Sequence, residues 1–123
     1  MTVKKHVMPC EVHDSVVIKG ETLDGSTEEL TVWIRTQYDE RVHIIGLELS
    51  NGEERANWKH PLLITRRMVN AIIALSDAYP CVLEKLFFIS DDPARVRLNK
   101  RLFAQKGYNI SEKFHGIYQV TKK

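Results

Sequence analysis

The chain has 123 residues, of which 43% are apolar and 28% are charged, and its formal net charge is +2. A chain of this length and apolar content closes one hydrophobic core, so we predict a single domain over residues 1–123. Charges of both signs are interspersed, which excludes a disordered tail, and the small net charge gives no overall case for binding nucleic acid or a membrane.

The two cysteines, Cys10 and Cys81, each stand beside a proline in an apolar stretch, and we interpret them as reduced thiols. Two cysteines do not form the framework of a small secreted protein, which favours a reducing compartment. The N-terminus carries no basic and then apolar run of signal-peptide type, and no window approaches the ~18 to 20 apolar residues of a membrane span. We therefore expect a cytoplasmic protein that does not bind a membrane.

The N-terminal half is predicted to consist of β-strands, because short β-branched runs alternate with turn clusters at spacings too short for helices. Turns are expected at 23–26, at 37–41 and at Asn51-Gly52. An exposed edge strand near the N-terminus would allow a dimer through sheet extension, so the oligomeric state stays open. The predicted strands are 3–8, 13–19, 30–36 and 42–49.

The C-terminal half is predicted to alternate helices and strands. Apolar residues recur at helical spacing after Thr65, a suitable N-cap, which predicts a helix over 66–79. A strand buried on both faces is expected at 82–90, and a helix over 93–106 ends at Gly107. The fold class is therefore α+β, with a mixed, mainly antiparallel sheet and two main helices. The remaining predicted strands are 108–113 and 116–121.

From Val42 to Thr121 the predicted order is strand, helix, buried strand, helix, a glycine followed by an aromatic residue, and strand. This order resembles the fold of the GNAT family of N-acetyltransferases, whose penultimate helix ends in a Gly-aromatic pair matched here by Gly107-Tyr108. The N-terminal region has no room for the two leading helices of that family. The resemblance implies a GNAT-like fold truncated at the N-terminus, with a cleft where the two central strands splay apart near Leu49 and Ile64.

The chain departs from the family at the residues that carry the chemistry. The tyrosine that protonates the departing coenzyme thiolate falls on Phe103, whose ring has no proton to give. The asparagine that contacts the cofactor falls on Val96, although Asn99, one turn later, could point to a different surface. Some family members carry a general base on a strand at the position of Glu48, which makes Glu48 the catalytic candidate.

The family's glycine-rich loop, which cradles the pyrophosphate of acetyl-CoA on backbone N–H groups, has no counterpart in residues 62–70. Without glycines, the backbone does not approach the phosphates closely. Only the predicted helix N-terminus at Thr65, Arg66 and Arg67 remains as an anion site. Together with Asn99, these three residues are the candidate cofactor-binding residues.

A further resemblance is to short, diverged GNAT-like proteins of phages, including internal core proteins of T7-like phages. These proteins share an aromatic strand, a basic helix, a glycine and a final strand with the end of this chain. The resemblance implies a non-catalytic protein without a cofactor, in the host cytoplasm or the virion, that binds a protein partner or acts as a structural component. The alternative is an acetyl-CoA-dependent N-acyltransferase.

The second predicted helix carries the strongest surface feature of the chain. Wheel spacing places Arg97, Lys100 and Arg101 on one arc, while Leu102 and Phe103 turn inward. Such an arc binds phosphates or an acidic patch on a protein partner, or it is a solvated helix face. A third interpretation of the chain is therefore a nucleic-acid-binding domain that uses this helix.

No metal site is predicted. The five histidines show no ligand spacing such as His-x-x-x-His, and no cysteine pair accompanies them. For His60, which precedes Pro61 and the first predicted helix, a surface position is the favoured interpretation.

Overall fold

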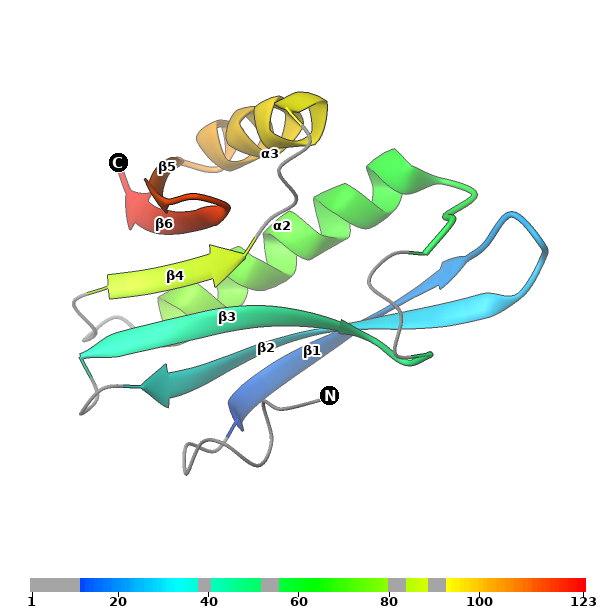
Figure 1. Ribbon diagram of the computed structural model, residues 1–123, viewed down its shortest axis with the longest axis horizontal. Coiled ribbons are helices and arrows are strands. Elements are labelled where there is room, and N and C mark those ends of the chain that lie inside the picture. Colours follow the sequence, from blue (N-terminus) through cyan, green and yellow to red (C-terminus); the bar gives the residue numbers. More distant parts are fainter. Residues whose placement is uncertain (1–11, 38–40, 52–55, 80–83, 89–92) are drawn as a thin grey trace.

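The computed structural model describes residues 12–37, 41–51, 56–79, 84–88 and 93–123, which form one six-stranded sheet and two helices (Figure 1). The predicted α+β class with a mixed sheet and two helices is confirmed. The helices are α2 (Pro61–Ala78) and α3 (Pro93–Gln105). The strands are β1 (Val12–Glu21), β2 (Thr27–Gln37), β3 (Val42–Leu49), β4 (Glu84–Phe88), β5 (Tyr108–Phe114) and β6 (Ile117–Lys122).

The strands lie side by side in the order β1-β2-β3-β4-β6-β5. Every neighbouring pair is antiparallel except β3 and β4, which run parallel and are connected through α2. The mainly antiparallel, mixed sheet is therefore as predicted. β1 and β5 form the edges of the sheet as far as the structure describes it, and the strand predicted at 3–8 lies outside the described residues.

The turn between β1 and β2 forms where the sequence predicts it, and its side chains hold it closed. Gly25 has a φ of +88°, a left-handed conformation that glycine adopts without a steric penalty. Oδ1 of Asp24 accepts hydrogen bonds from the Thr22 hydroxyl at 2.5 Å and the Ser26 amide at 2.9 Å. These hydrogen bonds lower the pKa of Asp24 to about 2, and the bond from the Thr22 hydroxyl contributes most.

One face of the sheet carries the hydrophobic core, because side chains alternate between the two faces of a strand. Both helices lie against this face: α2 packs on β1 and β2, α3 packs on β5, and the helices touch each other (Figure 1). The fully buried apolar side chains come from both the sheet and the helices. They are Val32, Ile34, Ile45, Ile72, Phe87 and Phe103.

Two predicted elements differ from the structure. Helix α2 begins at Pro61 and not at Arg66, because proline suits the first position of a helix, where its missing N–H is not needed. Thr65 is therefore not the N-cap, and its hydroxyl donates to the Pro61 carbonyl at 2.9 Å inside the helix. The strand predicted to be buried on both faces is buried at Phe87 but half-exposed at Leu86, which points to the face opposite the helices.

Candidate functional site

Helix α3 has one charged face and one buried face, as the wheel spacing predicts. Arg97, Lys100 and Arg101 are all exposed, whereas Leu102 and Phe103 are buried against the core. The helix ends at Gln105, and Gly107 follows with a φ of +85°. The three cations therefore form a continuous exposed surface along the outer side of α3.

A groove of about 240 Å³ lies between α2 and α3, and the three cations are not among its lining residues. Arg66 and Asn70 line it from α2, and Gln105 and Lys106 line it from the end of α3. Val69 and Leu102 complete its lining, which contains two cations and no acid among the described residues. We refer to this surface, together with Arg97, Lys100 and Arg101, as the basic groove.

The structure separates the three residues predicted as an anion site at the start of the first helix. Only Arg66 lines the basic groove. Thr65 is half-buried and bonded within the helix, and Nη1 of Arg67 donates to the carbonyl of Lys19 on β1 at 3.2 Å. The anion site predicted at a helix N-terminus is therefore wrong in its geometry, because these residues lie in the second turn of α2.

Phe103 and Asn99 lie on the inner side of α3. Phe103 has no exposed surface, and its ring centre lies 5.6 Å from that of Phe87. Asn99 is also fully buried: its Nδ2 donates to the Arg95 carbonyl at 2.9 Å, and its Oδ1 has no hydrogen-bond partner within the described part of the chain. The expectation that Asn99 points to a surface is wrong.

The two central strands share a short paired stretch within the described residues. β3 and β4 pair from Val42 opposite Glu84 to Ile45 opposite Phe87, and beyond that point β3 pairs only with β2 among the described strands. Leu47 shares the helix side of the sheet with Val32 yet is 37% exposed, so the sheet is not fully covered at this end of β3.

Glu48 lies on β3 beyond the residues paired with β4. It is exposed and stands opposite Thr31 of β2, on the face of the sheet away from the helices. It therefore lies apart from the basic groove, and the structure brings none of the other predicted site residues to it.

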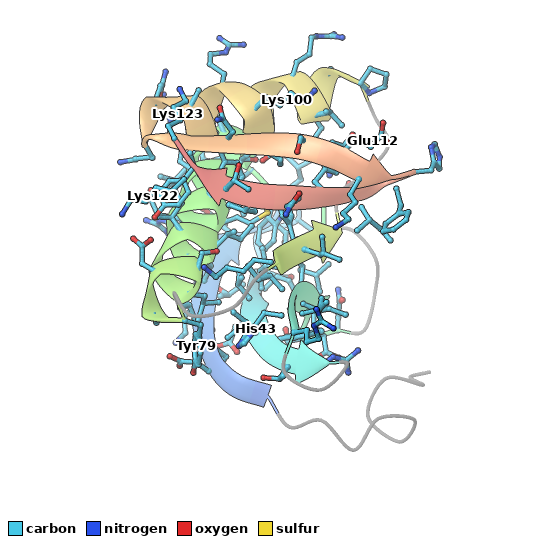
Figure 2. All side chains as sticks on the ribbon, turned by 90° about the vertical axis from the view of Figure 1, so that its left-hand side faces the viewer. His43, Tyr79, Lys100, Glu112, Lys122 and Lys123 are labelled. Carbon is cyan, nitrogen blue, oxygen red and sulfur yellow. The ribbon has the colours of Figure 1, made fainter. Side chains whose placement is uncertain are left out.

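A second cavity, of about 430 Å³, lies at the other end of α2, and no sequence pattern indicates it. Figure 2 views this side of the molecule, with Lys122 at the end of β6 and Tyr79 and His43 below it. The lining comes from α2, β4, β5 and β6, so no short motif could have revealed it. The lining residues are Ser76, Asp77, Lys85, Tyr108, Val120 and Lys122. We refer to this cavity as the Ser76 cavity.

A polar pair forms one wall of the Ser76 cavity. The phenol of Tyr108 donates a hydrogen bond to Oδ1 of Asp77. Burial, together with the bond to this carboxylate, raises the pKa of Tyr108 to about 12. The phenol therefore stays protonated at neutral pH and holds the Asp77 carboxylate in place.

Within the described ranges, no group of three or more His, Cys, Asp or Glu side chains is arranged to hold a metal ion, and His60 is exposed at the start of α2. No helix in the described part of the chain is long and apolar enough to cross a membrane. Comparison with family models, with curated proteins and with solved structures finds no match to this chain.

Proposed function

We propose that this chain is a non-catalytic GNAT-like protein that binds an acidic surface of a protein partner through the basic groove. The observation that carries the proposal is the contrast on α3. Its outer face exposes Arg97, Lys100 and Arg101, while Phe103, which occupies the position of the family's proton donor, is sealed in the core.

Two features support the absence of catalysis. A phenyl ring carries no ionisable proton, and Phe103 is in any case packed against Phe87 and closed to a substrate. At the start of α2, the first turn contains no glycine and begins with Pro61, which has no N–H group to offer a pyrophosphate.

The sheet supports the GNAT-like interpretation of the fold. The resemblance implies two neighbouring central strands joined through a helix, and β3 and β4, the parallel pair, are connected through α2. The chain runs from β3 through α2 to β4, then through α3 to the glycine that precedes β5, which is the element order of the resemblance.

The charges of the basic groove support an acidic protein surface as the ligand. Arg66 and Lys106 border the groove and three further cations follow on α3, so the local potential is positive although the net charge of the chain is only +2. Such exposed charges steer association and weaken with added salt, because screening extends over about 8 Å at physiological ionic strength. Arginine also forms bidentate bonds with carboxylates.

Cross-linking in extracts of the source cell tests this proposal. Lys100 and Lys106 provide reactive amines on the basic groove, so an amine-reactive reagent should join a partner to these two lysines. The double variant Arg97→Glu with Arg101→Glu should abolish those cross-links. The control, Arg41→Glu with Lys113→Glu, changes the net charge equally at two exposed positions outside both helices and should leave them intact. Cross-links that survive the first variant, or their absence from the wild type, overturn the proposal.

The alternative, an acetyl-CoA-dependent N-acyltransferase, is favoured only by the element order from β3 to β5. Isothermal titration with acetyl-CoA and with coenzyme A separates the two functions. Micromolar binding accompanied by acetylation of an amine would establish the enzyme, whereas the binding protein should release no heat with either compound.

A nucleic acid would bind through the same cations. The salt dependence of its binding distinguishes it from a protein partner. Binding to phosphates weakens steeply with salt, in proportion to the number of phosphates neutralised. A gel shift with single-stranded or duplex DNA that vanishes in Arg97→Glu with Arg101→Glu would replace the protein partner with a nucleic acid.

A further inference from the structure

Four exposed polar side chains face the groove between α2 and α3. Arg66 and Asn70 lie four residues apart on α2 and therefore share one side of that helix. Gln105 is the last residue of α3, and Lys106 follows it. None of the four side chains makes a hydrogen bond or an ion pair with residues 12–37, 41–51, 56–79, 84–88 and 93–123. Each helix therefore offers one cation and one free carboxamide to the same groove.

The electrostatic potential of this groove is positive, although it includes the C-terminal end of a helix. Such an end carries a partial negative charge on its carbonyl groups. At the end of α3, however, the carbonyl of Ala104 accepts hydrogen bonds from the Gly107 amide at 3.1 Å and from the Lys123 ammonium at 3.3 Å. No described acid lines the groove, so Arg66 and Lys106 set its charge.

The two carboxamides distinguish a peptide from a simple anion as the ligand. A carboxamide contains both a donor and an acceptor, as a peptide unit does, so Asn70 and Gln105 are able to bond to the N–H and C=O groups of a main chain. A site for a simple anion would need donors alone. The two cations match a carboxylate, since arginine binds it through two parallel hydrogen bonds and lysine adds a point charge.

The volume of the groove favours an extended segment of that peptide over a helix. One turn of an α-helix, about 10 Å wide and about 5.4 Å long, occupies about 400 Å³, which exceeds the groove volume of about 240 Å³. The main chain of a helix is also bonded internally, so it would leave the carboxamides without partners. An extended chain presents free N–H and C=O groups and is narrow enough to enter.

We propose that the groove between α2 and α3 holds an extended segment of the protein partner. The side chain of an Asp or Glu in this segment lies between Arg66 and Lys106, and its main chain bonds to the two carboxamides. This inference rests on the proposed function, because it specifies how the partner enters the basic groove. The exposed cations on the outer side of α3 then contact the acidic surface that surrounds the segment.

Titration of the protein with blocked peptides, followed by nuclear magnetic resonance, tests the groove without the partner. The probe is acetyl-Gly-Ala-Glu-Ala-Gly-amide, and the same peptide with Gln in place of Glu lacks the charge. Propionate carries the carboxylate of a Glu side chain without any peptide unit. The Glu peptide should bind at millimolar concentration and shift the side-chain amide signals of Asn70 and Gln105. The Gln peptide and propionate should both bind more weakly, and equal binding of either one, or no binding of the Glu peptide, overturns the proposal.

Variants separate this site from general attraction to a positive protein. Arg66→Gln should weaken binding of the Glu peptide about tenfold, because hydrogen bonds to charged groups are the stronger ones. Asn70→Ala keeps the net charge and should weaken binding about threefold, the effect of one neutral hydrogen bond. The matched charge control is Arg41→Gln, at an exposed position outside both helices, which should have no effect. Unchanged binding in Asn70→Ala, or an equal loss in Arg41→Gln, contradicts the proposal.

The cross-linking experiment distinguishes failure of this inference from failure of the proposed function. The double variant Asn70→Ala with Gln105→Ala should reduce the cross-links to the partner without a change in charge. Cross-links that require Arg97 and Arg101 but persist in full in this double variant overturn the inserted segment and leave the proposed function standing. Absence of cross-links from the wild type overturns the proposed function, and this inference with it.

Discussion

Buried polar groups are hydrogen-bonded to different extents in two regions of the molecule. These are the β1–β2–β3 region and the C-terminal region from α2 to β6. In the first region, Glu28 is only 8% exposed, and its Oε1 accepts hydrogen bonds from the Ser50 hydroxyl and from the amides of Glu29 and Asn51. In the second, Ser76 and Asn99 are buried at least as deeply, but Oγ of Ser76 and Oδ1 of Asn99 have no partner in the described part of the molecule.

This difference separates polar groups that the fold satisfies from polar groups that it leaves without a partner. A buried carboxylate with three donors is satisfied by the fold and needs no ligand to account for it. Oγ of Ser76 and Oδ1 of Asn99 are buried without a partner among the described residues, so the described fold does not satisfy them.

The largest expected effect tests whether apolar packing holds the C-terminal region together. Phe103→Ala removes a fully buried ring that lies against Phe87, and we expect it to lower the free energy of unfolding by about 3–5 kcal/mol. Urea denaturation measures this loss. The matched control is Phe114→Ala, where the ring is 57% exposed and the loss should stay below about 0.5 kcal/mol. Similar losses in both variants would contradict the assignment of Phe103 to the core.

The next effect tests close packing in the β1–β2–β3 region. A Cβ added at Gly46 would lie 2.0 Å from the indole of Trp33, which stands opposite it on β2. Gly46→Ala should therefore lower the free energy of unfolding by about 1–3 kcal/mol, because the indole must move from its position over the strand. Adding Trp33→Leu, which removes the obstructing ring, should recover part of this loss. Strictly additive losses in a double-mutant cycle would show that the two residues do not touch.

The sequence predicted the regular elements well because their signals are local. Gly25 and Gly107 stand at positive φ at the two predicted turn or helix-end positions, and alternation located the strands from β1 to β3. The predicted helix start at Arg66 lies five residues too late, because the apolar spacing becomes clear only after Thr65 while the helix begins at Pro61. The half-exposed Leu86 was missed because an apolar run does not reveal that one face of its sheet lacks a helix.

The candidate sites were predicted only where one element forms them. Arg97, Lys100 and Arg101 share a face of a single helix, so helical periodicity was sufficient. The basic groove requires α2 beside α3, and the Ser76 cavity requires four elements to converge. Burial of Asn99 and Ser76 likewise depends on which side of each helix meets the sheet. Residue type alone suggests the opposite, because asparagine and serine are mostly exposed.

A smaller effect, confined to acid, tests whether Glu28 is satisfied as a carboxylate. Hydrogen bonds lower the pKa of Glu28 below its ordinary value of 4.5. The bond from the Ser50 hydroxyl contributes most, and the bonds from backbone amides contribute less. A folded-state pKa below the unfolded value stabilises the fold above the unfolded pKa, and the stabilisation is lost as pH falls through the folded pKa. Glu28→Gln should therefore reduce the drop in urea midpoint below about pH 4.5.

Asp24 provides the control for this acid titration. Its pKa is lowered to about 2 from 3.8, so its contribution is lost at lower pH than the onset expected for Glu28. Asp24→Asn should flatten the midpoint curve between about pH 3.8 and pH 2. If Glu28→Gln left the urea midpoint unchanged at every acidic pH, the Glu28 side chain would not be hydrogen-bonded as a carboxylate in the folded protein.

The smallest effect is expected at Asn99, and it tests most directly whether the two regions differ in the hydrogen bonding of their buried polar groups. Asn99→Leu removes an oxygen without a described partner and one side-chain bond to the Arg95 carbonyl, and it adds apolar surface of similar volume to the core. The free energy of unfolding should change by less than about 1 kcal/mol, because replacing a poorly satisfied polar group with an apolar one of the same shape is nearly neutral. Asn99→Asp places a charge at the same position and should be strongly destabilising. A large loss in Asn99→Leu would mean that Oδ1 has a partner, and the C-terminal region would then match its polar groups as fully as the β1–β2–β3 region does.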